Sequence, residues 1–241
     1  MRSVTLIACG AVVAAMALGA VDASGGTAHI GCPGKDIRFR AADGTKLVAH
    51  RYGTGKTFVV LAHMADGDLC QWQDEARRLA SQGYSALAFD FRGAGESQVR
   101  SGGAAQRIER DVAAAVKLSR TLGAKKVLLV GASAGGWAVL VAAAQAKPSV
   151  QGVVAISTPA QYRGDAVAAV QTLKAPVLYV VSTDEGLSED ALALYDATGA
   201  GAKRLEILPG SAHGAEILDP ILNRSGYKAA RTLIESFLRK R

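Results

Sequence analysis

The chain has 241 residues, of which 49% are hydrophobic and 20% are charged, and its formal net charge is +7. This composition provides a sizeable apolar core and excludes an intrinsically disordered chain, which carries more charge and fewer apolar residues. Three cysteines exclude a small scaffold held by many disulfides, and 27 glycines without a collagen-like period exclude a collagenous chain.

The first 23 residues have the pattern of a secretory signal. Arg2 supplies a positive charge, residues 4–21 are almost continuously apolar, and small residues follow at the candidate cleavage sites. We therefore predict a signal peptide over 1–23, an extension over 24–34 and one domain over 35–241, with a secreted or periplasmic location. The alternatives are an uncleaved membrane anchor, since the apolar run has about the minimum spanning length, and a buried helix.

Removal of this segment changes the cysteine count. The segment contains Arg2 and Asp22, so the net charge stays +7, but it also contains Cys9, which leaves Cys32 and Cys70. Disulfides persist outside the cytosol, so a bridge between these two cysteines is our hypothesis, and two free thiols are the alternative. No membrane span is expected once the signal has been removed.

The rest of the chain alternates apolar strands with amphipathic helices. An opening hairpin over 37–41 and 47–52 is followed by predicted strands at 58–62, 85–89, 127–130, 150–156, 177–181 and 204–208. Predicted helices lie at 69–81, 108–122, 134–146, 164–173, 188–197 and 226–238, with Ser188 as a helix N-cap. Continuous apolar strands joined through helices predict an α/β fold, with a mostly parallel eight-stranded sheet covered on both faces.

A serine follows the fifth predicted strand in a characteristic setting. Gly131, Ser133 and Gly135 form G-x-S-x-G between a strand and a helix. Small residues two positions either side of the serine allow a sharp turn that exposes its hydroxyl at the top of the sheet. A nucleophilic serine is the prediction, and a glycine-rich turn with an idle serine is the alternative.

An acid and a histidine follow two later strands. Asp184 comes after the strand over 177–181, and His213 comes after the last strand. Ligands bind at the carboxyl ends of parallel strands, and the chain order Ser, Asp, His is one that serine hydrolases use. We predict His213 as the general base and Asp184 as its partner, because Asp184 lies nearest the strand end; Glu185, Asp219 and Asp165 are weaker alternatives.

These pieces together resemble the α/β-hydrolase fold serine hydrolases over about residues 35–241. The resemblance includes Leu61-Ala62-His63, the stretch over 89–97 and the motif around Ser133. It implies that backbone amides of Ala65 and Ala134 stabilise an oxyanion. Met64 stands where the family usually has glycine, so its own amide is an alternative donor. The resemblance also implies that Asp90, Arg92 and Ser97 brace loops, and the short gap between the sixth and seventh strands predicts no lid domain.

The expected activity is hydrolysis of small or medium carboxylic esters through an acyl-enzyme on Ser133, in an open site. A peptidase or amidase with the same triad, and a non-catalytic binding protein of the same fold, are the alternatives. Neither a metal nor an organic cofactor is implied. The basic residues are scattered and aromatic residues make up 5%, so we expect no nucleic-acid partner. The sequence does not indicate an oligomeric state.

Overall fold

The computed structural model describes residues 32–241, so the predicted signal over 1–23 lies outside the described residues. Within them an eight-stranded sheet has the strand order β1-β2-β4-β3-β5-β6-β7-β8. β1 and β2 form the antiparallel edge, β2 is also antiparallel to β4, and the remaining pairs are parallel. The strands are β1 (Asp36–Arg40), β2 (Lys46–Tyr52), β3 (Thr57–Ala62), β4 (Ser85–Phe89), β5 (Lys126–Ala132), β6 (Gly152–Ile156), β7 (Val177–Ser182) and β8 (Lys203–Leu208).

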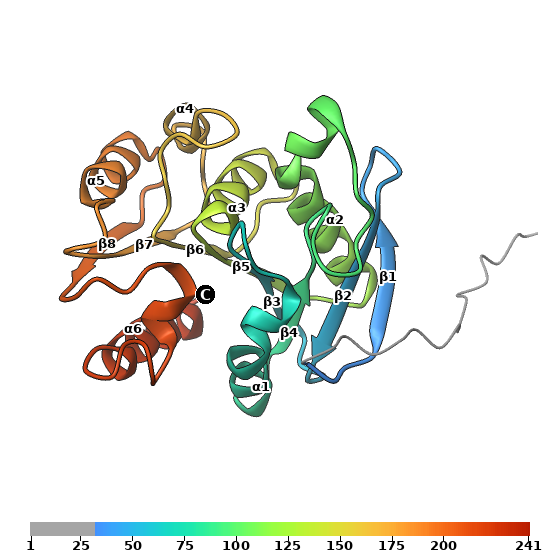
Figure 1. The fold of residues 1–241 in the computed structure, drawn as a ribbon, viewed down its shortest axis with the longest axis horizontal. Coiled ribbons are helices and arrows are strands. Elements are labelled where there is room, and N and C mark those ends of the chain that lie inside the picture. Colours follow the sequence, from blue (N-terminus) through green and yellow to red (C-terminus); the bar gives the residue numbers. More distant parts are fainter. Residues whose placement is uncertain (1–31) are drawn as a thin grey trace, which may run out of the picture.

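Helices cover both faces of the sheet, as Figure 1 shows. The α-helices are α1 (Gln73–Ser81), α2 (Ile108–Thr121), α3 (Ala134–Gln145), α4 (Ala166–Val170), α5 (Ser188–Ala197) and α6 (Tyr227–Arg239). Side chains of α2, α3, α4 and α5 share one apolar core with the sheet, whereas α1 and α6 share the other. The predicted α/β architecture is therefore confirmed.

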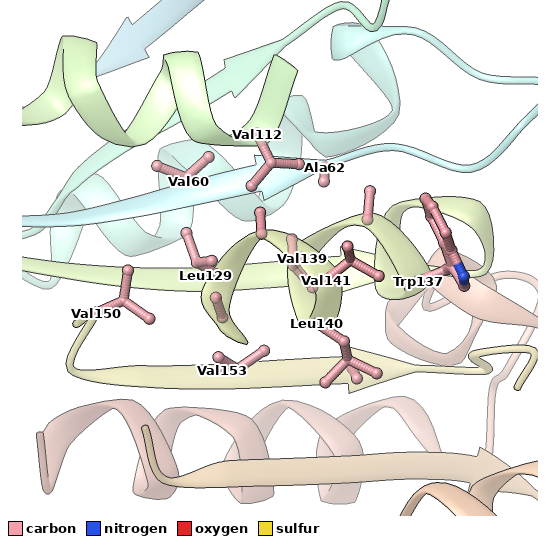
Figure 2. Close-up of a cluster of buried hydrophobic side chains, with 14 of the residues drawn as sticks. Val60, Ala62, Val112, Leu129, Trp137, Val139, Leu140, Val141, Val150 and Val153 are labelled. Carbon is pink, nitrogen blue, oxygen red and sulfur yellow. The ribbon is translucent and has the colours of Figure 1, made fainter. Parts of the chain in front are cut away.

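The strand side chains alternate between these two cores. On β3, Val60 and Ala62 join the core under α2 and α3, while Val59 and Leu61 join the core under α1 and α6. This is the period of two that a strand imposes. Figure 2 shows the first core, where residues of α3 meet side chains of β3, β5 and β6.

Helix α3 lies at the centre of that core. All ten residues from 134 to 143 are buried, so the helix is apolar on every side, as expected of a helix enclosed by other elements. This burial fixes the position of its first turn, which directly follows Ser133.

Two local expectations need correction. The predicted helix over 69–81 is divided into a 3-10 turn, η1 (Leu69–Trp72), and α1. The Asp68 side chain starts the turn by accepting a hydrogen bond from the Cys70 amide at 2.8 Å. The prediction of Ser188 as an N-cap is wrong, because Ser188 is already the first residue of α5 and Leu187 occupies the cap without a side-chain bond. Two further 3-10 turns, η2 (Gly102–Gln106) and η3 (Gly214–Leu218), were not expected.

A disulfide joins Cys32 to Cys70, with 5.4 Å between their Cα atoms. This is the pair that the sequence suggested. It fastens the start of the described chain to η1, and Cys32 is fully buried in the core beside α1 and α6. Between β6 and β7 the only helix is α4, so no lid domain is inserted there. Among residues 32–241, none of the helices combines the length and the apolar character that crossing a membrane requires.

Candidate active site

The candidate site lies where the strand order reverses. The chain runs from β3 to β4 on one side and then returns to place β5 on the other side of β3. In open parallel sheets this reversal creates a crevice at the carboxyl ends of the strands. Residues 63–65 follow β3 at this crevice, and Ser133 follows β5.

Ser133 is held in a strained backbone conformation. Its φ and ψ are 52° and −116°, a region that residues with a side chain occupy only when the surroundings enforce it, at about 1–3 kcal/mol. Its amide donates to the Ile156 carbonyl at 2.8 Å. A Cβ on Gly131 would lie 2.2 Å from the Gly135 carbonyl oxygen, and one on Gly135 would lie 2.2 Å from the Ala62 oxygen. The two glycines therefore permit this turn, as predicted.

The structure places Glu185, not Asp184, against the histidine. Glu185 Oε2 lies 2.7 Å from His213 Nδ1, and the Glu185 side chain is 1% exposed. Asp184 is exposed, and its amide donates to the Gly210 carbonyl at 2.9 Å. The prediction of Asp184 as the partner of His213 is therefore corrected to Glu185, which was one of the alternatives.

The reason for this correction lies in the turn after β7. The strand continues to Ser182, one residue further than predicted, and the chain then reverses. The reversal brings the Glu185 carboxylate back over the strand end, where Oε1 accepts a hydrogen bond from the Ser182 amide at 2.5 Å. Nearness to the strand in sequence therefore did not decide which carboxylate faces inward.

Ser157 completes this cluster and was not identified from the sequence. It directly follows β6, is fully buried, and has a φ of 49°. Its hydroxyl donates to Glu185 Oε1 at 2.9 Å and accepts from the Gly214 amide at 2.7 Å. One side chain thus joins the acid to the histidine loop. The only sequence signal for it was its position at a strand end.

No hydrogen bond connects Ser133 with His213 within residues 32–241, but both are attached to the end of β6. Ser133 is bonded to Ile156 and the residue after His213 is bonded to Ser157. A Cβ built on Gly214 would lie 3.5 Å from the Cβ of Ala132, so the histidine loop packs beside the serine turn. The His213 side chain is 36% exposed, which leaves its ring accessible from solvent. Catalytic hydrogen bonds are often long before substrate binds.

The backbone donors proposed for an oxyanion differ in availability. The Met64 amide donates to Gln71 Oε1 at 2.9 Å, so Met64 is not a free donor. In the described part of the chain, no acceptor engages the amides of Ala65 or Ala134. Ala134 is also the first residue of α3, where unpaired amides and the helix dipole favour negative charge.

His63, which precedes these donors, has a structural role. Its Nδ1 lies 2.6 Å from the Met64 carbonyl, which can only accept, and its Nε2 accepts from the Phe91 amide at 3.0 Å. The ring is therefore neutral with its proton on Nδ1. Burial lowers the pKa of His63 to about 4. The neutral ring joins the loop after β3 to the loop after β4.

The residues expected to brace loops do so. Asp90 accepts from the Leu69 amide at 2.8 Å and from the Glu96 amide at 2.9 Å. The Ser97 hydroxyl donates to the Asp90 carbonyl at 2.8 Å and accepts from the Val48 amide. Arg92 has no exposed side-chain surface and is paired with Asp111 and Asp43. This prediction is confirmed.

Among residues 32–241, no group of three or more histidine, cysteine, aspartate or glutamate side chains is arranged to hold a metal ion.

Comparisons with known proteins agree with this arrangement. Residues 54–168 match the family model described as serine aminopeptidase, S33, of the Hydrolase_4 type. An esterase from Pyrococcus furiosus superposes with a TM-score of 0.68 at 16% identity, over 87% of this chain and 99% of that one. A malate-bound thermophilic esterase from Thermogutta terrifontis gives 0.70 at 18%, over 86% and 98%. The enol-lactonase from Burkholderia xenovorans LB400 gives 0.69 at 17%, over 84% and 100%. The sheet order and these matches together show that this chain has the α/β-hydrolase fold.

Proposed function

We propose that this protein is a serine hydrolase of the α/β-hydrolase fold, which cleaves carboxylic esters through an acyl-enzyme on Ser133. The observation that carries the proposal is the hydrogen-bonded series from Ser157 through Glu185 to His213. That series ends at an accessible imidazole beside a serine held in a strained turn. A fold retained only for binding would have no need to keep Glu185 buried against a histidine or Ser133 strained.

The mechanism follows from the positions of these groups. His213 Nε2 accepts the Ser133 proton as Oγ attacks the ester carbonyl, while Glu185 orients the ring and stabilises its protonated form. The amides of Ala65 and Ala134 donate to the oxyanion. When the tetrahedral intermediate collapses, His213 gives its proton to the leaving alcohol. Water then attacks the acyl-enzyme with His213 again as base, which releases the acid and restores Ser133.

The choice of ester over amide rests on the comparisons and on the open site. Esterases and an enol-lactonase are among the similar solved structures, whereas the family model carries an aminopeptidase description. Between β6 and β7 the chain forms only the short helix α4, and no lid domain is inserted there. An uncovered site of this kind suits esters of small or medium size.

A fluorophosphonate probe tests the nucleophile directly. We expect it to label the wild-type protein and the control variant Ser149→Ala, which alters an exposed serine, but not Ser133→Ala. Absence of labelling on folded wild type, or labelling that persists in Ser133→Ala, would refute the proposal. An ester and an amide with the same acyl group then decide the class, since equal or faster amide cleavage would make the protein an amidase.

We also propose that the protein is exported after cleavage near residue 23. The Cys32–Cys70 disulfide supports this, because such bonds persist in oxidising compartments. N-terminal sequencing of protein recovered from outside the cytosol is expected to begin close to residue 24. Recovery of the intact N-terminus from the membrane fraction would instead support the anchor.

A further inference from the structure

A cavity of about 140 Å³ lies beside the candidate oxyanion donors. Its lining includes Ala65 and Ala134, and also Tyr162 and Arg163 from the loop between β6 and α4. The cavity thus extends from the two amides that would hold the carbonyl oxygen of a bound ester.

The lining of this cavity carries one positive charge that no carboxylate of the described residues compensates. It contains two arginines and neither aspartate nor glutamate. The charge of Arg92 is neutralised by Asp111 and Asp43, and His63, also in the lining, is neutral because burial lowers its pKa to about 4. Arg163 is different, since within residues 32–241 no carboxylate pairs with it.

The position of Arg163 is nonetheless well defined. Its Nη1 donates to the Ala105 carbonyl at 2.5 Å, and its guanidinium carbon lies 5.3 Å from the centre of the Tyr162 ring. The loop itself is attached to α3, because Trp137 Nε1 donates to the Gly164 carbonyl at 3.0 Å and the Trp137 and Tyr162 rings meet edge to face. One donor is used for this attachment, so the others remain for a ligand.

The chemistry of the cavity favours a carboxylate. Guanidinium binds carboxylates through two parallel hydrogen bonds, and the N-terminus of the 12-residue helix α3 adds its positive end at Ala134. His213, which must reach the leaving oxygen, does not line the cavity. We therefore assign the acyl chain of the ester, and not its alcohol, to this cavity.

We propose that the preferred substrates carry a carboxylate at the end of a short acyl chain, and that Arg163 binds this group. The proposal rests on the proposed ester hydrolysis for its catalytic consequence, but binding of the anion does not depend on turnover. Half-esters of short dicarboxylic acids are the class of compound that fits this description.

Two methyl esters of matched shape test the preference. Monomethyl glutarate carries the carboxylate, and methyl 5-methylhexanoate replaces it with an isopropyl group. Wild type is expected to show at least tenfold higher kcat/KM for monomethyl glutarate than for the neutral ester, and Arg163→Gln is expected to lose that preference. Arg163→Lys should retain part of the preference. The control Arg204→Gln removes the same charge from the edge strand β8 and should leave the preference unchanged.

A binding measurement separates this proposal from the catalytic one. Glutarate, but not glutaramide, is expected to raise the melting temperature of wild type and of Ser133→Ala, and to have no effect on Arg163→Gln. If the fluorophosphonate probe fails to label Ser133 while this shift remains, the enzyme proposal fails and the carboxylate site stands. A wild type that prefers the neutral ester, or a shift by glutarate that persists in Arg163→Gln, would overturn the carboxylate site.

Discussion

Two charged clusters lie at the carboxyl ends of strands, one after β4 and the other after β7, and they differ in how much of the cluster solvent can reach. In the first, Arg92 and Asp111 have no exposed side-chain surface, and each nitrogen of the guanidinium donates to Asp111, Asp43 or the Ala104 carbonyl. In the second, Glu185 is 1% exposed, but its partner His213 is 36% exposed.

This difference distinguishes a cluster that only holds loops together from one that can take part in a reaction. A cluster whose hydrogen-bonding groups are all satisfied inside the protein can only hold its loops together, and the pKa of Arg92 rises through Asp111 and Asp43 even though burial opposes it. In the second cluster the carboxylate is satisfied by Ser157, Ser182 and His213, while the far nitrogen of the imidazole is available to a substrate. A fixed carboxylate behind an accessible base is the arrangement that general-base catalysis needs.

The largest expected effect comes from removing the carboxylate charge behind His213. Glu185→Gln keeps the shape but cannot hold the ring in the required tautomer, so we expect kcat on an ester to fall by about 10³ or more. The matched variant Asp184→Asn alters the exposed neighbour and is expected to stay within threefold. Steady-state kinetics of both variants on the same ester provide the measurement.

The opposite result for Glu185→Gln and Asp184→Asn would contradict the assignment of Glu185 as the acid. If Asp184→Asn lost activity and Glu185→Gln kept it, the acid first predicted from the sequence would be the functional one. The contacts of Glu185 would then be structural, like those of Asp111.

The strands, the helices and the serine turn could be predicted from the sequence, whereas several residues of the site could not. The periodicity of apolar residues predicted the eight strands and the six helices because each element buries a continuous apolar surface, and the motif around Ser133 identified the turn because only glycine fits at 131 and 135. The prediction of Asp184 as the acid was wrong, since the choice between Asp184 and Glu185 depended on where β7 ends and how the next turn reverses. Ser157 gave no signal beyond its position at a strand end, and Arg163 gave none, because their contacts are with residues far away in the chain.

A smaller effect, on stability instead of catalysis, is expected in the closed cluster. Asp111→Ala leaves the buried Arg92 with only part of its compensation, so the free energy of unfolding should fall by about 3–5 kcal/mol. The folded fraction should keep its kcat within threefold. Arg204→Ala breaks an exposed pair with Glu206, and at most about 1 kcal/mol is expected there. Urea unfolding measures both losses of stability. A fall in kcat of more than threefold in the folded fraction of Asp111→Ala would contradict the distinction between the clusters.

The neutral state of His63 predicts a pH dependence of stability. Its pKa is lowered by burial from 6.5 to about 4, so between these values the unfolded chain takes up a proton that the folded protein excludes. The stabilisation is therefore present above pH 6.5 and is lost as the pH falls toward 4, on the order of 3 kcal/mol in total. Urea unfolding across this range should show the loss in wild type and less of it in His63→Asn.

A second measurement keeps this prediction testable if His63→Asn does not fold. The NMR resonance of the His63 ring in wild type is expected to stay constant from pH 8 to pH 5.5. A titration midpoint near 6.5 would show that the ring is not held neutral by the Met64 carbonyl and the Phe91 amide.

The smallest of these effects concerns Ser157. Ser157→Ala removes the hydroxyl that donates to Glu185 and leaves the buried Gly214 amide without its acceptor. Glu185 keeps its contacts with His213 and with the Ser182 amide, so we expect kcat to fall only about tenfold, which corresponds to about 1.4 kcal/mol. KM should not change, because Ser157 is buried away from the cavity that would hold the substrate.

Ser182→Ala is the matched control for this last comparison. The Ser182 hydroxyl donates to the Ala212 carbonyl at 2.6 Å, so it also fastens the histidine loop, but its side chain does not contact the Glu185 carboxylate. If Ser157 acts by positioning that carboxylate, Ser157→Ala should lower kcat more than Ser182→Ala does, even where the two variants lower the melting temperature by the same amount. Equal losses of kcat in the two variants would show that fastening the loop is sufficient and that the contact with Glu185 adds nothing.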